Sequence, residues 1–288
     1  DIYRYYCGKY IGTFYDYFSI IFIFCSFIVM MGGAGSTIHQ YFNLPNWTGS
    51  VGMMVLVCAV TLLGLNGLIE VIGKMGPAIA IIAIFLGVYS FLSNPGGVIT
   101  GSEAVVSGQL EVVKVGVNPV TSAGSYLGFC MLWLAAFLAA MGPGTNSTRE
   151  GIAGTTAGAI GFVLGCTSMM LGELAYMPEL YNSDIPALIL AGKIGGWLSF
   201  VFTIIIFCGI FTTAVPLLWQ VSSRFTKEGS MQFKITTVVC AVVGTVIALF
   251  VPFQTLVNVI YGINGYVGII LLVFIIAKEV MRKMGKAK

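Results

Sequence analysis

Two adjacent threonines are the side chains of this chain whose type and spacing best suit ion binding. They are Thr212 and Thr213, in the apolar segment 209–214, which reads GIFTTA. Because an α-helix has 3.6 residues per turn, neighbouring side chains point about 100° apart, and two hydroxyls can face one crevice. Hard cations prefer oxygen ligands, so we predict that Thr212 and Thr213 bind sodium. The alternative is that both hydroxyls bond back to the preceding helical turn.

Glycine-rich ends of two apolar stretches offer a second kind of ligand, the free backbone group. Gly142 opens a Gly-Pro-Gly run at the end of stretch 123–142, and residues 32–35, which read GGAG, end stretch 14–35. Irregular backbone at membrane depth is either buried in protein or lines a cavity. We therefore expect Gly33 and Gly142 to line a solute site. The alternatives are an ordinary helix end at Gly142 and close helix packing at Gly33.

Few other residues have the spacing that chemistry requires. Trp133, in the middle of stretch 123–142, either lines a solute path or packs against a neighbouring helix. The seven cysteines are scattered without metal-ligand spacing, and His39 is the single histidine. No nucleophile–base constellation, HExxH motif or P-loop is present in the sequence. We expect no enzyme activity, no cofactor, and no metal other than a coupling sodium ion.

The composition of the chain restricts its class. Of its 288 residues, 58% are hydrophobic and 9% are charged, whereas soluble domains average about 45–50% and 25%. The mean hydropathy is +0.96. A formal net charge of +3 is too small for a phosphate-binding surface. These values exclude a soluble enzyme, a disordered chain and a nucleic-acid binder, and they predict an integral membrane protein whose main partner is the lipid bilayer.

The polar residues must be positioned by membrane-spanning helices, each of which needs about 20 apolar residues. Eight such stretches are present: 14–35, 50–69, 75–93, 123–142, 151–172, 195–219, 235–251 and 255–277. With eight alternating spans, twelve Lys and Arg fall on the side of the chain ends, and Lys114 and Lys193 on the other. The positive-inside rule then places both ends in the cytoplasm of a multi-pass plasma-membrane protein. The chain starts at Asp1, so we expect a single transmembrane domain over 1–288 that is incomplete at its N-terminus.

Two segments resemble a known family. Residues 8–44 begin with GKYIG, continue as an apolar helix with a GGAG end, and are followed by Pro45. Residues 179–220 contain Asp184-Ile185-Pro186 and then GIFTTAV from 209. Both segments resemble the YkvI-like bacterial membrane proteins. That family is similar to the amino acid–polyamine–organocation transporters, which have the LeuT-type fold of two inverted five-helix repeats.

The resemblance implies an arrangement and site residues. The eight stretches would be core helices three to ten of the LeuT-type bundle, and 173–194 would be the outer loop that caps the substrate path. Thr212 and Thr213 would match the hydroxyl pair of the sodium site on the eighth core helix. Stretch 123–142 would be the broken sixth core helix, in which Ala136-Phe137-Leu138 departs from the polar Ser-Phe-Asn of relatives. Phe137 and Met141 would then line the site with apolar groups.

These observations lead to two functional hypotheses. The first is a secondary transporter of amino acids or related small solutes, sodium-coupled, which works by alternating access. The alternative is a non-transporting membrane receptor or assembly scaffold with the same fold. The identity of the solute and the oligomeric state stay open.

Overall fold

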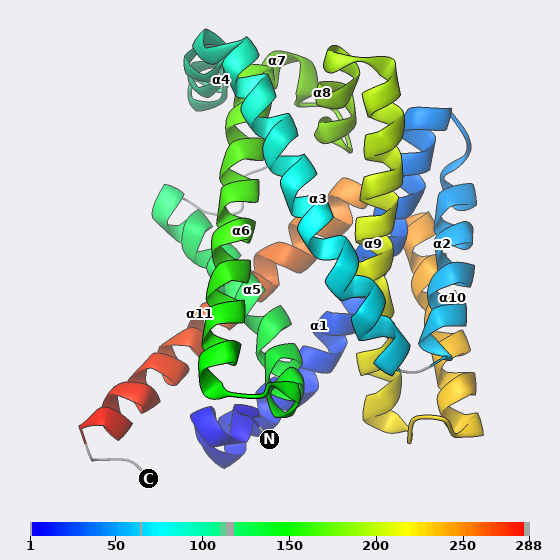
Figure 1. The fold of residues 1–288 in the computed structure, drawn as a ribbon, viewed down its shortest axis with the longest axis vertical. Helices are drawn as coiled ribbons and strands as arrows, with labels where there is room; N and C mark the ends of the chain where they lie inside the picture. Colours follow the sequence, from blue (N-terminus) through cyan, green and yellow to red (C-terminus); the bar gives the residue numbers. More distant parts are fainter. Residues whose placement is uncertain (1, 64, 111, 113–117, 285–288) are drawn as a thin grey trace. The chain divides into compact units, whose positions relative to one another are not determined.

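The computed structural model describes residues 2–63, 65–110, 112 and 118–284. Within these ranges, the side chains of 65–75, 136, 137, 139–141 and 143 lie outside the description. Every regular element in the described part of the chain is a helix (Figure 1). The α-helices are α1 Ile2–Phe42, α2 Asn46–Thr61, α3 Leu65–Ser93, α4 Pro95–Val106, α5 Pro119–Met141, α6 Thr148–Ala175, α7 Met177–Leu180, α8 Pro186–Ile194, α9 Gly196–Phe225, α10 Met231–Phe250 and α11 Phe253–Lys283.

Six helices in the described residues are long and apolar enough to cross a membrane. They are Ile2–Phe42, Gly76–Ser93, Thr148–Ala175, Gly196–Phe225, Met231–Phe250 and Phe253–Lys283. The prediction of an all-helical protein with membrane-spanning segments is confirmed in this form. The expected stretch 50–69 corresponds in part to α2, an apolar helix of 16 residues, and 123–142 corresponds to α5. The count of eight spans stays a prediction.

Several helix boundaries differ from the expected ones. Helix α1 continues through its glycines to Phe42, and α2 ends at Thr61, shortly before α3 begins at Leu65. The expected loop 94–122 contains α4 and the start of α5. There the Asn118 side chain accepts from the Thr121 N–H at 2.9 Å, and the Thr121 hydroxyl accepts from the Asn118 N–H at 3.1 Å. This reciprocal capping box satisfies backbone donors that a helix start leaves free.

The described chain divides into two compact units. The first unit comprises Asp1–Ser26, Val113–Gly151 and Gln254–Lys288, and the second comprises Phe27–Val112 and Ile152–Phe253. Helix α1 contributes its first part to the first unit and its last part to the second. The predicted Trp133 and Gly142 belong to the first unit, whereas Gly33 and the two threonines belong to the second.

The first unit has an aromatic core between α1, α5 and α11. Its buried members are Tyr3, Cys7, Tyr15, Phe22, Phe129, Leu132 and Leu271. The Tyr15 hydroxyl donates to the carbonyl oxygen of Val267 at 2.9 Å, which ties α1 to α11. Helices α5 and α11 approach closely, since a Cβ added to Gly128 would lie 2.1 Å from the carbonyl oxygen of Gly265. Only glycine permits this backbone contact.

The second unit is built around α9, which packs against α2, α3, α8 and α10 (Figure 1). Helix α1 packs on α2 through small residues: a Cβ added to Gly35 would lie 2.6 Å from the Ser50 hydroxyl oxygen. Helix α3 packs on α6 in the same way, where a Cβ added to Gly87 would lie 2.3 Å from the carbonyl carbon of Ser168. These contacts position the end of α1 and the segment between α6 and α9, which together form the site described next.

Candidate functional site

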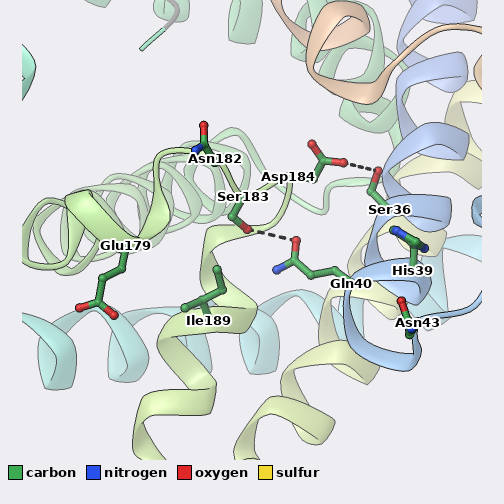
Figure 2. A pocket seen from close by; sticks show the side chains of 9 residues that line it. All are labelled: Ser36, His39, Gln40, Asn43, Glu179, Asn182, Ser183, Asp184 and Ile189. Atoms are coloured by element: carbon green, nitrogen blue, oxygen red, sulfur yellow. Dashed lines mark hydrogen bonds between the residues drawn. The ribbon is translucent and has the colours of Figure 1, made fainter. Parts of the chain in front are cut away.

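A polar pocket lies between the end of α1 and the connection from α7 to α8, entirely within the second unit (Figure 2). Its volume is about 500 Å³. The lining side chains are nearly all polar or charged: Ser36, His39, Gln40, Asn43, Glu179, Asn182, Ser183, Asp184 and Ile189. A concave site with convergent polar groups at the end of apolar helices is a place where a polar solute can bind.

The helical repeat explains the α1 side of the pocket. Ser36, His39 and Gln40 are separated by three and four residues, so they share one face of the helix. The helix ends at Phe42, and Asn43 adopts a φ of 54°, a left-handed conformation that asparagine tolerates better than most residues. Pro45 then precedes α2. The polar face therefore occupies the last turns of α1.

Two short helices position the other side of the pocket. Helix α7 ends at Leu180, and α8 begins at Pro186, where proline at the first turn costs no hydrogen bond. The connection between them carries Asn182, Ser183 and Asp184. Helix α8 packs on α9 and α3, and this packing anchors the connection to the core of the second unit.

Four hydrogen bonds join the two sides. The Gln40 side-chain N–H donates to the carbonyl oxygen of Ile185 at 2.8 Å, and its amide oxygen accepts from the Ile185 backbone N–H at 3.0 Å. The same oxygen accepts from the Ser183 hydroxyl at 3.1 Å. The Ser36 hydroxyl donates to the Asp184 carboxylate at 3.1 Å (Figure 2). We call these residues the Gln40 latch: Ser36, Gln40, Ser183, Asp184 and Ile185.

The primary amide of Gln40 carries separate donor and acceptor atoms, so it can donate to and accept from the same backbone unit at once. A carboxylate at this position would place its negative charge against the Ile185 carbonyl oxygen. A hydrocarbon would remove the side-chain partner of both backbone groups, which would keep only the contacts with the Ser183 hydroxyl and the Leu188 N–H. The latch is therefore specific to the residue type at position 40. It docks the α7–α8 connection on α1 beside the pocket.

The charges around the pocket are unevenly compensated. Glu179 forms an ion pair with Lys193 at 2.5 Å, and the same ammonium lies 4.6 Å from the Tyr176 ring centroid. Asp184 has no cationic partner within ion-pair distance in the described residues. His39 Nδ1 lies 2.8 Å from the Leu44 carbonyl oxygen, to which it donates. The pocket thus suits a polar solute that carries a positively charged group.

Thr212 and Thr213 occupy a different place in the second unit. Both hydroxyls donate to the carbonyl oxygen of Gly209, at 3.0 Å and 2.9 Å. This is the back-bonding that the sequence left open as an alternative, and it leaves hydroxyl lone pairs as potential cation ligands. A Cβ added to Gly33 would lie 3.6 Å from the Ile210 side chain and 3.2 Å from Phe253. The structure therefore brings Gly33 against the helical turn that carries the threonine pair.

The remaining predicted residues lie on or after α5 in the first unit. The Trp133 ring lies 5.4 Å from that of Phe129, and its buried indole N–H has no acceptor among the described residues. Gly142 follows the last residue of α5, is exposed, and has open space where a Cβ would be added. The side chains of Phe137 and Met141 lie outside the described residues. No interruption of α5 occurs between Pro119 and Met141 in the described backbone.

The latch was missed in the sequence. Gln40 and Ile185 are 145 residues apart, and nothing in one sequence pairs them. A weaker signal was present, since Ser36, His39 and Gln40 place three polar side chains on one face at the end of an apolar helix.

Comparison of the chain with protein-family models, curated proteins and solved structures gives no match. Groups of three or more metal-ligating side chains are also absent from the described part of the chain. We therefore infer function from the geometry of the sites themselves.

Proposed function

We propose that the chain is a secondary transporter of amino acids or related small solutes. The observation that carries this proposal is the polar pocket of about 500 Å³ at the end of α1, beside which the Gln40 latch docks the α7–α8 connection. A polar cavity at the end of long apolar helices can bind a polar solute where it enters a membrane protein. Asp184 supplies the negative charge that an amino group requires, and the neighbouring amides and hydroxyls supply hydrogen bonds.

The proposed mechanism is alternating access. The latch consists of a few hydrogen bonds on a partly exposed surface, each worth about 0.5–1.5 kcal/mol. Such contacts can break and re-form within a transport cycle. In this proposal, solute passes the pocket when the connection is released, and the connection docks again behind it.

Sodium is the proposed coupling ion. The Thr212 and Thr213 hydroxyls donate to the Gly209 carbonyl oxygen, and the lone pairs of these two hydroxyl oxygens make two neutral oxygens available within one helical turn. Sodium is a hard cation that oxygen ligands suit. In the second unit, Gly33 lies against the turn that carries the threonine pair and is the proposed lining residue there. Trp133, Phe137, Met141 and Gly142 are proposed lining residues that belong to the first unit.

The finer architecture is part of the same proposal. We infer eight spans corresponding to core helices three to ten of a LeuT-type bundle, in a YkvI-like protein of the plasma membrane with both chain ends in the cytoplasm. The short helices α7 and α8 support the assignment of 173–194 as a structured outer loop. The twelve-to-two distribution of basic residues supports the orientation.

A sodium-dependence experiment tests this function. The full chain is purified, and its melting temperature is measured with a panel of amino acids in sodium and in potassium buffer. We expect one solute class to stabilise the protein more in sodium, and the Thr212→Ala and Thr213→Ala variants to lose that difference. If the solute-induced rise in melting temperature depends on sodium equally in both variants and the parent, the two threonines do not form the sodium site. Solute-induced stabilisation without uptake into proteoliposomes would favour the receptor or scaffold instead.

A further inference from the structure

The beginning of α1 and the end of α11 form one surface in the first unit. Gly8 has a φ of +76°, which is the left-handed region that favours glycine. Segment 2–7 therefore bends back, and a Cβ added to Gly12 would lie 2.5 Å from the Arg4 Cα. The Tyr6 hydroxyl donates to the Glu279 carboxylate at 3.3 Å. Lys278 donates to the carbonyl oxygen of Tyr5, and its ammonium lies 3.9 Å from the Tyr5 ring centroid.

This surface carries an excess of positive charge. Within residues 2–16 and 278–283, five basic side chains face two acidic ones, a net charge of +3: the basic residues are Arg4, Lys9, Lys278, Arg282 and Lys283, and the acidic residues are Asp16 and Glu279. The carboxylates are already engaged, Asp16 by Arg4 at 3.9 Å and Glu279 by Arg282 at 2.7 Å. The ammonium groups of Lys9 and Lys283 are exposed and have no protein partner within the part of the chain that the structure describes.

An exposed aromatic and apolar stripe continues from Lys9 along α1. Its members are Tyr10, Phe14, Tyr17 and Ile21, whose exposed fractions are 87%, 55%, 64% and 63%. Their spacing of four, three and four residues keeps them on one face of the helix. Tyrosines of this kind lie at the level of lipid headgroups in membrane proteins, and aliphatic side chains lie deeper. The stripe thus begins next to a free cation and ends in an apolar part of a candidate spanning helix.

We propose that this surface binds anionic phospholipid, with headgroup phosphates at its exposed ammonium groups, those of Lys9 and Lys283, and with acyl chains along the stripe from Tyr10 to Ile21. Charge complementarity selects an anionic over a zwitterionic headgroup, since each basic side chain near a membrane surface favours anionic lipid. The apolar stripe that adjoins the cations selects a lipid over a soluble phosphate or an acidic peptide, neither of which would cover it. The proposal depends on insertion of α1 and α11 into a bilayer and not on transport.

The test measures lipid preference with the purified full chain in a non-ionic detergent. Phosphatidylglycerol or phosphatidylcholine is titrated in, and retained lipid is counted by native mass spectrometry. We expect the parent to retain phosphatidylglycerol preferentially, and the Lys9→Gln/Lys283→Gln double variant to bind it about fivefold more weakly per removed cation. The matched control is Lys227→Gln/Lys234→Gln, which removes two exposed cations from the second unit and should retain the parental affinity.

Two results would overturn the proposal. One is equal retention of the two lipids by the parent, and the other is an equal loss of affinity in both double variants. If the Lys9→Gln/Lys283→Gln variant fails to fold, the salt dependence of lipid retention by the parent protein tests the proposal instead. Raising sodium chloride from 0.1 to 1 M should then weaken phosphatidylglycerol retention more than phosphatidylcholine retention, because salt screens exposed charges. The absence of any salt effect on that difference would contradict the assignment.

Discussion

Replacing Gln40 by leucine tests the latch directly. The substitution removes the side-chain partner of both the N–H and the C=O of Ile185 and the acceptor of the Ser183 hydroxyl. A typical hydrogen bond contributes about 0.5–1.5 kcal/mol net. Because the Ile185 N–H also reaches the Ser183 hydroxyl oxygen at 3.2 Å, part of its protection remains. We therefore expect the docked connection to lose about 1–2 kcal/mol, which raises its open population about 5–30-fold.

Amide hydrogen exchange measures this change at the affected bond. The exchange rate of the Ile185 N–H should rise by the same 5–30-fold factor, because exchange occurs from the locally open state. Gln40→Glu should raise the rate as well, since its carboxylate faces the Ile185 carbonyl oxygen. The control is Asn182→Ala, a pocket-lining change outside the latch, which should leave the rate nearly unchanged. Parental exchange of Ile185 in Gln40→Leu would refute the reasoning.

Two further predictions concern helix packing in the first unit. Gly128→Ala should lower the melting temperature by an amount corresponding to about 1–3 kcal/mol, since its Cβ would lie 2.1 Å from the Gly265 carbonyl oxygen of α11. The control is Gly158→Ala, where open space surrounds the added Cβ, and this change should be neutral or slightly stabilising. Equal effects of the two substitutions would contradict the close packing of α5 on α11. Tyr15→Phe should cost about 0.5–1.5 kcal/mol because it removes the hydrogen bond between the Tyr15 hydroxyl and the Val267 carbonyl oxygen of α11. Tyr17→Phe on the exposed face should change the melting temperature little. Thermal unfolding in detergent checks both pairs.

The helical content was predictable because apolar length alone specifies membrane-spanning helices. Helices α6, α9, α10 and α11 overlap the expected stretches closely for that reason. The end of α1 was not predictable. Glycine is a helix breaker in water, but here Gly35 lies against Ser50, and the packing of α2 on its surface compensates for the missing side chain. The helix consequently continues to Phe42, and these added turns carry the pocket.

The polar pocket could not have been located from one sequence. One side of the pocket carries Ser36 and Gln40. The other side is the segment from Ser183 to Ile185, which lies more than 140 residues further along the chain. Local periodicity indicates that a polar face exists but not what it contacts. The threonine pair was found because its unusual feature, two hydroxyls in an apolar helix, is local. Its role in binding sodium stays a prediction.

Uptake into proteoliposomes tests the central proposal most directly. The full chain is reconstituted, and accumulation of radiolabelled amino acids is followed with an inward sodium gradient and with potassium in its place. We predict accumulation of at least one amino acid above protein-free vesicles in sodium, its loss in potassium, and strongly reduced accumulation in the Thr212→Ala/Thr213→Ala variant. The transporter assignment would be contradicted if the protein is folded and still stabilised by solute, but its vesicles take up no amino acid above the level of protein-free vesicles.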